Sequence, residues 1–474
     1  MAELTQTSLK TRLLPYAIEE IKDGKFLVSG YFSGWAILSE EEVSLLRSER
    51  HHESPALYKK LEDSGIIINS RNVEKAAEIY RGTNRNLFSP PSLHMINVTN
   101  TCNYRCRYCH AGVSQGKDIM SEKTALKVLK FIFQSGGPCI TIEFQGGECL
   151  LNWKVVRLIS EKARELNRVF KKNLHVCIVS NLSLMDEEKL KFLTDHDVAI
   201  CTSLDGSREI HDANRRTALG QDTFQTTKER MRFIKDYYRS RGQDRKVDVL
   251  ATITRAALSD PKAIVDMYIE LGIKTLHLRP VHNFGDALSR WPQLTYTPEE
   301  FYEFWKEAME YIFKLNRNGI DIIERGAYNI IRRIFHNDAY YVELMSPTGM
   351  GRTALLYNYD GAVFNSDEGR MIPERIFQIG TVDEDPKEVL TSKENVSVWT
   401  SSFMDLLSYN SAFRPWGGIH PVKIYQDQGT IIPNISEHSE YKIYTLQCRY
   451  LFEKIAEDDF EKKLLMDWCN KIIK

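Results

Sequence analysis

The segment HMINVTNTCNYRCRYC, residues 94–109, joins a strand-like run to a set of metal-ligand side chains. Residues 94–98 form a strand-like run around the apolar Met95, Ile96 and Val98, and the cysteines at 102, 106 and 109 follow closely. Three residues separate the first two cysteines and two separate the last two, a spacing that lets one loop place three thiolates around one face of a four-iron cluster. One iron of such a cluster has no protein ligand. We therefore predict an iron–sulfur cluster with an open iron at the end of this strand.

The alternatives are a structural zinc site and three unrelated thiols. Structural zinc is normally closed by four ligands with paired spacing. The nearby fourth candidate is His110, which directly follows Cys109 and cannot easily turn back. The spacing of the cysteines and their position after a strand agree, so the cluster is the favoured interpretation.

Strand-like runs alternate with helix-period stretches through the middle of the chain. The runs lie at 94–98, 139–144, 174–179, 198–204, 247–253 and 275–278, and the helical stretches at about 122–135, 153–170, 186–194, 223–238 and 261–271. This alternation predicts an α/β fold with a parallel sheet, either an open doubly wound sheet or a partial (βα)6 barrel. In both, side chains that do chemistry gather at the carboxyl ends of the strands.

The later strand ends carry further candidate ligands. After the second run, two glycines precede Glu148, an arrangement in which the backbone can approach a ligand and the carboxylate can pair with an ammonium group. The third run ends before Asn181, and the fourth contains Ser203 and is followed by Arg215. Taken alone, each of these could equally be a turn or a helix cap.

In combination, the cysteine triad with Tyr108 before its last member resembles radical S-adenosylmethionine (SAM) enzymes. The later strand ends resemble the branch of anaerobic sulfatase-maturating and SPASM peptide-modifying enzymes, over about residues 92–280. The resemblance implies one 4Fe-4S cluster whose open iron chelates SAM, and reductive cleavage of SAM to a radical that abstracts hydrogen from substrate. It implies metal ligation by Cys102, Cys106 and Cys109. It also implies SAM contacts from Tyr108, Gly147, Glu148, Asn181, Ser203, Arg215 and Leu276, and it assigns no catalytic acid or base.

Residues 1–88 are predicted to form a small α+β domain. Runs at 16–21 and 26–31 flank Asp23-Gly24, which is a hairpin signal. Ser39 with Glu42 predicts a capping box, and a second helix is expected from Ser54-Pro55. The stretch 81–91 ends in two prolines and is interpreted as a linker. We expect this domain to recognise a peptide by strand addition, before a core domain at 92–295.

Residues 296–474 are predicted to be a SPASM-like extension with most of its cluster ligands replaced. A helix is expected at 301–315, a hairpin at 355–365 and mostly helix over 441–474. The resemblance leads us to expect cysteines at the positions of Met350, Ser366, Gly417 and His420, and of that set Cys448 remains. An auxiliary cluster is therefore not expected. The runs 357–361 and 366–371 are similar to those of maturases of His-Xaa-Ser peptide systems.

The composition limits the functional classes. The chain has 474 residues, 27% of them charged, and a net charge of −1, which gives no field to attract nucleic acid or membranes. No signal peptide or membrane span is visible, so we expect a cytoplasmic protein. The expected partners are a precursor peptide or small protein and an electron donor such as flavodoxin or ferredoxin. Alternatives are a radical SAM enzyme acting on a small molecule and a non-catalytic regulatory homologue.

Overall fold

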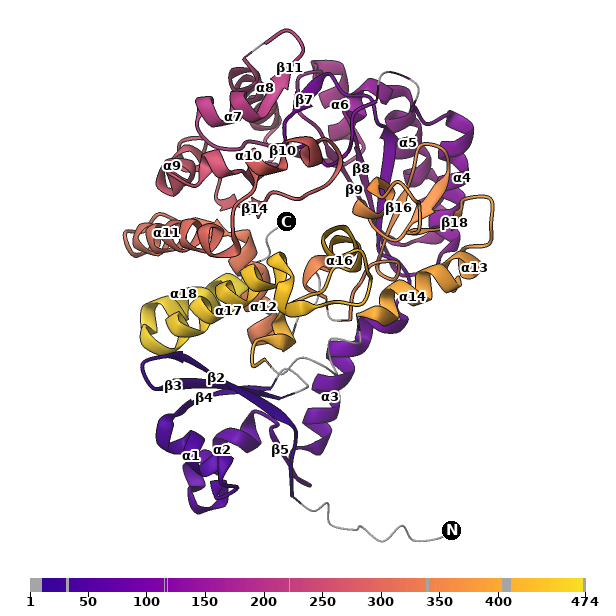
Figure 1. The fold of residues 1–474 in the computed structure, drawn as a ribbon. Coiled ribbons are helices and arrows are strands. Elements are labelled where there is room, and N and C mark those ends of the chain that lie inside the picture. The colour runs from indigo at the N-terminus through magenta and orange to yellow at the C-terminus, as the bar shows by residue number, and fades with distance from the viewer. Residues whose placement is uncertain are drawn as a thin grey trace, which may run out of the picture.

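A computed structural model describes residues 11–30, 34–114, 116, 118–220, 222–337, 341–345, 347–402 and 411–471. The chain is arranged in three parts (Figure 1). An N-terminal unit lies at one end of the molecule and a helix-covered parallel sheet at the other, and the C-terminal helices lie between them. Among the residues described, no helix is both long and apolar enough to cross a membrane.

The N-terminal unit is a three-stranded antiparallel sheet with helices on one face. Its elements are β1 (Arg12–Leu13), β2 (Tyr16–Lys22), β3 (Lys25–Gly30), β4 (Trp35–Ser39), α1 (Glu40–Arg47), α2 (Pro55–Asp63), β5 (Ile67–Ile68) and α3 (Val73–Asn84). β2 and β3 pair around Asp23 and Gly24, both at positive φ, which confirms the predicted hairpin. The Ser39 capping box and the Ser54 cap are also present.

This sheet is the middle layer of a sandwich. Ala36 and Leu38 of β4 pack into the core of the unit itself. Trp35, on the opposite face, packs against Phe335 and Phe452 of the C-terminal part, and its indole Nε1 donates to the Ile334 carbonyl at 3.1 Å. The predicted linker at 81–91 is not a plain connector, because α3 extends through residue 84 and a 3-10 turn follows at 85–88. The unit is thus docked on the C-terminal helices.

The central sheet has nine strands, in the order β14-β12-β10-β9-β8-β6-β16-β17-β18. Its strands from the middle of the chain are β6 (Leu93–Thr99), β8 (Cys139–Gly146), β9 (Asn173–Val179), β10 (Val198–Ser203), β12 (Val247–Ile253) and β14 (Leu278–Pro280). All neighbouring pairs among these six are parallel, which confirms the predicted parallel sheet. The helices that follow the strands are α4 (Glu122–Gln134), α5 (Trp153–Phe170), α6 (Glu187–Asp195), α8 (Thr223–Ser240) and α9 (Pro261–Glu270).

Short elements that the sequence pattern did not predict surround the cysteine segment. β7 (Tyr104–Cys106) lies inside it and pairs antiparallel with β11 (Arg215–Thr217), which follows α7 (Arg208–Asn214). The last predicted run divides into β13 (Thr275–Leu276) and β14, because β13 pairs with β15 (Ile323–Glu324) instead. Cys139 is exposed at the start of β8.

The C-terminal part continues the central sheet and then closes over it. β16 (Ala354–Tyr357) pairs parallel to β6, and β17 (Ala362–Phe364) and β18 (Gln378–Thr381) add antiparallel, so the predicted hairpin is confirmed and joins the main sheet. The helices of this part are α10 (Trp291–Leu294), α11 (Pro298–Arg317), α12 (Arg325–His336), α13 (Pro386–Leu390), α14 (Lys393–Ser401), α16 (Pro421–Gln428), α17 (Ser439–Glu457) and α18 (Asp459–Asn470).

Candidate functional site

The three cysteines lie on one loop at the carboxyl edge of the parallel strands. β6 ends at Thr99, and the loop is anchored to the next strand because Gly147 N–H donates to the Thr99 carbonyl at 2.7 Å and Glu148 N–H to the Thr101 carbonyl at 2.9 Å. A Cβ on Gly147 would lie 2.3 Å from the Thr101 carbonyl oxygen. Glycine is therefore needed here for the close approach of the two loops, whereas the sequence suggested approach to a ligand.

The thiols lie close enough together to influence one another. The pKa of Cys102 and that of Cys109 are each raised to about 12, mainly by burial and to a smaller extent by the neighbouring thiols. The pKa of Cys106 is also raised by burial, although the Arg215 guanidinium opposes the shift. Buried thiols of this kind are protonated near neutral pH and lose their protons when a metal binds. Among the described residues, no three His, Cys, Asp or Glu side chains are grouped tightly enough for a single ion.

Glu148 is a fully buried carboxylate in this loop. Its Oε1 accepts from Leu150 N–H at 3.0 Å and from the Ser180 hydroxyl at 2.8 Å, and its Oε2 accepts from Asn181 N–H at 2.8 Å. Burial raises its pKa, and these hydrogen bonds, with Arg215, oppose the rise. Glu148 thus joins the ends of β8 and β9.

Asn181 brings the end of β9 into contact with the cysteine loop. Its side-chain Nδ2 donates to Asn103 Oδ1 at 2.9 Å and lies 4.0 Å from the Cys102 sulfur. Ser203 ends β10 at the same edge of the sheet and is half-buried. The structure therefore brings both residues to the carboxyl edge, as the sequence predicted.

Tyr108 links the cysteine loop to a buried pair of opposite charges. Its hydroxyl donates to Asp205 Oδ2 at 2.7 Å and accepts from Arg215 Nη1 at 2.7 Å. Burial raises the pKa of Tyr108 well above its usual value, so the phenol stays protonated. The Nε of Arg215 is buried and has no protein partner, which leaves a donor on a permanent cation beside the thiols. Asp205 was not predicted, although it follows Ser203 closely in the same strand-end motif.

Leu276 lies apart from this group. It is fully buried on β13, on the amino side of β14, and it packs in the main hydrophobic core. Chemistry at a parallel sheet gathers at the carboxyl ends of the strands. Leu276 is therefore not among the residues that the fold brings together at that edge.

The C-terminal part holds the cysteine loop from the outside. Asp367 accepts from His110 Nε2, with the two atoms 2.9 Å apart, and from Arg370 Nε at 2.8 Å. Arg370 Nη1 in turn donates to Asn100 Oδ1 at 3.1 Å. Residues on both sides of the cysteines are thus fixed by one short segment. No sequence signal pointed to this contact, because Asp367 is 257 positions from His110.

A pocket opens beside β14, at the same edge of the sheet. It is lined by Arg279, His282, Tyr341, Glu343 and Tyr444, among others. Arg279 is in register with Thr252, whose N–H donates to Asp205 at 3.3 Å, so the pocket lies one strand away from the Tyr108–Asp205–Arg215 group.

The pocket wall is charged but internally neutralised. Glu343 accepts from Arg279 at 3.0 Å and from the Tyr341 hydroxyl at 2.7 Å, and buried Lys423 donates to Glu440 at 2.8 Å. Burial raises the pKa of Glu343, but the nearby cations outweigh it and hold that pKa well below its usual value. Burial, reinforced by Lys423, lowers the pKa of His282 to about 3. His282 is therefore neutral, and its Nε2, 3.3 Å from the Lys423 ammonium, acts as an acceptor.

The positions expected to have lost cluster cysteines are buried. Met350, Ser366, His420 and Cys448 are each at most 3% exposed, and His420 Nε2 lies 3.2 Å from Glu368 Oε2. Ser346 begins the segment 346–367, which belongs to the extension with replaced cluster ligands. Ser346 itself lies outside the described residues. That no auxiliary cluster binds here stays a prediction.

Known proteins share this architecture. The sequence profile of the Radical SAM superfamily matches residues 96–267. The cysteine-type anaerobic sulfatase-maturating enzyme of Clostridium perfringens is 31% identical over 158 residues, which are 31% of this chain and 42% of that protein. The radical SAM cyclopropyl synthase TigE of Paramaledivibacter caminithermalis is 26% identical over 155 residues, covering 29% of this chain and 32% of that protein. The matched segments thus span less than half of either relative.

Two solved structures extend the similarity to most of the chain. Native anSMEcpe with bound AdoMet has a TM-score of 0.64 at 19% identity, covering 80% of this chain and 99% of that one. Streptococcus suis SuiB bound to the precursor peptide SuiA has a TM-score of 0.54 at 11% identity, covering 87% of this chain and 97% of that one. At these identities the match is one of fold.

Proposed function

Residues 96–267 are a radical SAM domain, and we propose that the enzyme containing it modifies a residue within a ribosomally made peptide or small protein. The observation that carries the proposal is the convergence of three partly buried thiols, the Tyr108–Asp205–Arg215 group and the Glu148 loop at one edge of the parallel sheet.

The donor set fits the cofactors that characterise this superfamily, a 4Fe-4S cluster and SAM. Cys102, Cys106 and Cys109 would hold the cluster, and Tyr104 N–H, 3.3 Å from the Cys102 sulfur, would stabilise a thiolate there. When bound, the two cofactors supply reductive cleavage of SAM and hydrogen abstraction from the substrate.

Arg215 is the residue best placed for an anionic group of SAM. Its guanidinium is oriented by the Tyr108 hydroxyl, and its buried Nε is free to donate. A carboxylate next to it would form charge-assisted hydrogen bonds, which are about twice as strong as neutral ones. We therefore assign the SAM carboxylate to Arg215. We assign Glu148 and Asn181 to the shape of the site, because their side chains are already engaged by the protein.

The pocket beside β14 is the proposed place of the target residue. It lies one strand away from the Tyr108–Asp205–Arg215 group, and its walls come from residues after the matched domain, on β14 and in the C-terminal part. Because its ion pairs are mutually satisfied, it offers no free charge to a charged side chain. A neutral target residue with hydrogen-bonding groups fits this wall.

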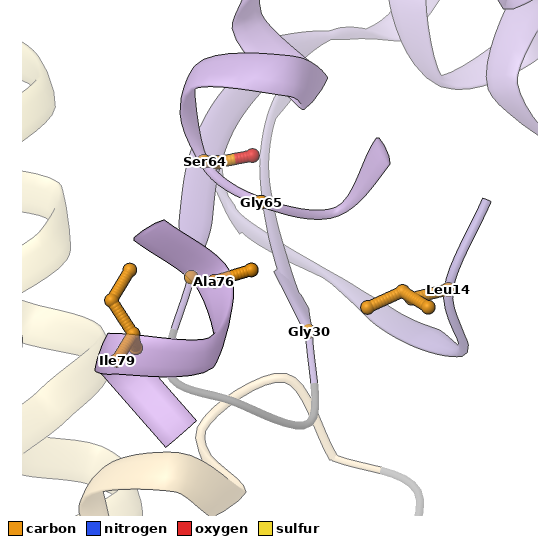
Figure 2. A pocket seen from close by; sticks show the side chains of 7 residues that line it. Leu14, Gly30, Ser64, Gly65, Ala76 and Ile79 are labelled. Carbon is orange, nitrogen blue, oxygen red and sulfur yellow. The ribbon is translucent and has the colours of Figure 1, made fainter. Parts of the chain in front are cut away.

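The N-terminal unit is the proposed recognition site for the peptide. Among the described residues, no strand pairs with the outer edge of β4, and strand addition there would supply main-chain hydrogen bonds. A small pocket lies beside the start of β4 (Figure 2), lined by Leu14, Gly30, Gly34, Ser64, Gly65, Ala76 and Ile79. Its wall is largely apolar, and its space suits a group of about methyl size. SuiB, a similar fold, has been solved with its precursor peptide.

The proposal is tested by anaerobic reconstitution with iron and sulfide. We expect about four irons per chain, 5′-deoxyadenosine by mass spectrometry, and a mass change in a short peptide encoded beside this protein's gene. Replacing the three loop cysteines by Ala should remove both iron and 5′-deoxyadenosine. Cys139→Ala, at an exposed thiol, should remove neither and serves as the matched control. Retention of half the iron by the triple variant would contradict the assignment, and SAM cleavage without any peptide product would point to a small-molecule substrate.

A further inference from the structure

Two arginines face each other directly across the small ladder that carries the middle cysteine. Arg105 of β7 is in register with Arg216 of β11, so the two side chains stand on the same face. Both residues are exposed. Like charges directly opposite one another destabilise a strand pair. The arrangement therefore calls for an explanation other than stability of the ladder.

The structure provides no carboxylate to neutralise this pair. Arg105 Nη1 donates to the carbonyls of Cys102 and Tyr104 at 2.5 and 2.8 Å, and Arg216 Nε donates to the Ala213 carbonyl at 3.2 Å. Within the part of the chain that is described, neither guanidinium forms an ion pair. Half-buried Arg107, which lies between Cys106 and Cys109 in the sequence, forms none there either. The whole chain has a net charge of −1, so this positive face is a local feature.

Nearby acids are committed elsewhere. Asp212 accepts from the Thr223 hydroxyl and the Phe224 N–H, each at 2.8 Å, and Asp222 pairs with Arg208. Asp286 also lies beside the cluster loop: its N–H donates to the Cys109 carbonyl at 2.8 Å, its side chain is half-buried, and its charge contributes to the raised pKa of Cys106 and Cys109. The electrostatic potential at the exposed face of the ladder is therefore positive, because the arginines dominate it.

This face also adjoins a proposed ligand of the cluster. Arg105 precedes Cys106 directly, and Cys106 is in register with Arg215, the neighbour of Arg216. A partner bound to the two exposed arginines would therefore lie about one residue from a cluster ligand. Electron transfer between proteins falls steeply with distance, so proximity of this kind favours it.

We propose that the exposed face of the β7–β11 ladder, with Arg105 and Arg216 at its centre and Arg107 beside them, docks an acidic electron-transfer protein. One electron leaves the reduced donor, which is oxidised, and enters the cluster held by the three cysteines; no atom or proton is exchanged. The proposal rests on the cluster of the proposed function but not on its peptide substrate. The ladder and the N-terminal unit lie at opposite ends of the molecule (Figure 1), so a donor and a leader can bind together.

The test measures reduction of the reconstituted full-length protein by stopped-flow absorbance with two reductants. Reduced flavodoxin is the acidic protein probe, and photoreduced 5-deazaflavin is the small-molecule probe. Arg105→Glu/Arg216→Glu should slow reduction by flavodoxin about tenfold or more, because steering by complementary charge contributes at least that much to association. The same variant should change reduction by deazaflavin less than twofold. In the unchanged protein, the flavodoxin rate should fall as salt is added.

A matched variant and a milder one make the result decisive. Lys123→Glu/Lys130→Glu reverses two exposed charges on α4, away from the ladder, and should leave both rates unchanged. If charge reversal costs the protein its iron, Arg105→Gln/Arg216→Gln decides, because an amide can still donate to the loop carbonyls. An unchanged ratio of the two rates in the ladder variants would overturn the proposal. So would loss of precursor-peptide binding with the flavodoxin rate intact, since the face would then recognise an acidic peptide.

Discussion

At the scale of single residues, the position of Glu148 separates two roles that sequence alone cannot distinguish. A carboxylate after two glycines suggests an acceptor for the SAM ammonium group. In the structure, its two oxygens already accept from Leu150, Ser180 and Asn181, and it is completely buried. A buried carboxylate with three donors is a structural tie between two loops. Its effect on SAM would then act through the shape of the site.

The change Glu148→Gln tests this role. Glutamine replaces an acceptor oxygen by a donating NH₂ group, which must face a backbone N–H or the Ser180 hydroxyl. We expect a loss of about 1–3 kcal/mol in the free energy of unfolding of the cluster-free protein, measured with urea. Glu209→Gln, at an exposed carboxylate that bonds the nearby Ser207 hydroxyl, should leave the unfolding midpoint unchanged. If Glu148 served only to bind SAM, the cluster-free variant would be as stable as the original protein.

At the scale of elements, the segment that begins at Asp367 acts as a brace for the cysteine loop. Asp367 bonds His110 on one side of the cysteines, and Arg370 bonds Asn100 on the other. Arg370 is almost fully buried, with 4% of its side chain exposed. The C-terminal part therefore contributes directly to the order of a loop that begins more than two hundred residues earlier.

Removing Arg370 should loosen the loop without unfolding the protein. In Arg370→Gln, Asn100 loses its donor and Asp367 keeps His110 alone. We expect amide hydrogen exchange in residues 100–111 to become about tenfold faster, which corresponds to about 1.4 kcal/mol of local stability. Exchange in β9 and β10 should not change. Arg375→Gln, which breaks an ion pair of 3.1 Å with half-exposed Asp360 in the same part of the chain, is the control. Equal exchange in the two variants would mean that Arg370 does not brace the loop.

The elements also show what the sequence could predict. Five of the six parallel strands were found because each is a short apolar run followed by a helix-period stretch, and Val247–Ile253 agrees with β12 to the residue. The sixth, β14, was found only at its first residue, because the predicted run 275–278 is divided between β13 and β14. β7 and β11 were missed because they are three residues each and carry arginines, tyrosine and cysteine in place of apolar alternation. At the site, the thiols were predicted by spacing. Asp205 and Asp367 were not, because their partners are brought to them only by the fold.

At the scale of the whole molecule, the N-terminal sheet is held between its own helices and those of the C-terminal part. Ile21 and Leu27 belong to the main hydrophobic core, and Glu19 accepts from Arg449 of α17 at 3.1 Å. This arrangement corrects the expectation of a unit separated by a linker. Deleting residues 1–88 would expose part of the core, so that truncation cannot isolate the recognition role. A test of peptide binding needs a change confined to the edge of the sheet.

The edge of β4 offers such a change. Gly30 N–H donates to the Gly34 carbonyl at 2.8 Å. Because hydrogen-bonded pairs alternate along antiparallel strands, Trp35, Ile37 and Ser39 point their N–H groups away from β3. Ser39 agrees with this assignment, since its N–H bonds Glu42 outside the sheet at 3.0 Å. Ile37 therefore carries the central outward N–H that an added strand would use.

The change Ile37→Pro removes that donor while leaving the ladder to β3 intact, because proline is tolerated at the outward positions of an edge strand. Ile37→Val keeps the donor and is the matched control. We expect the proline variant to bind a labelled precursor peptide about tenfold more weakly by fluorescence anisotropy. The lost hydrogen bond contributes about 1 kcal/mol, and the register of the added peptide strand on β4 is disturbed with it. Formation of 5′-deoxyadenosine without peptide should match that of the valine variant, because β4 lies far from β7 of the cysteine loop (Figure 1). Equal peptide affinity in the two variants, with both folded by circular dichroism, would exclude strand addition at β4.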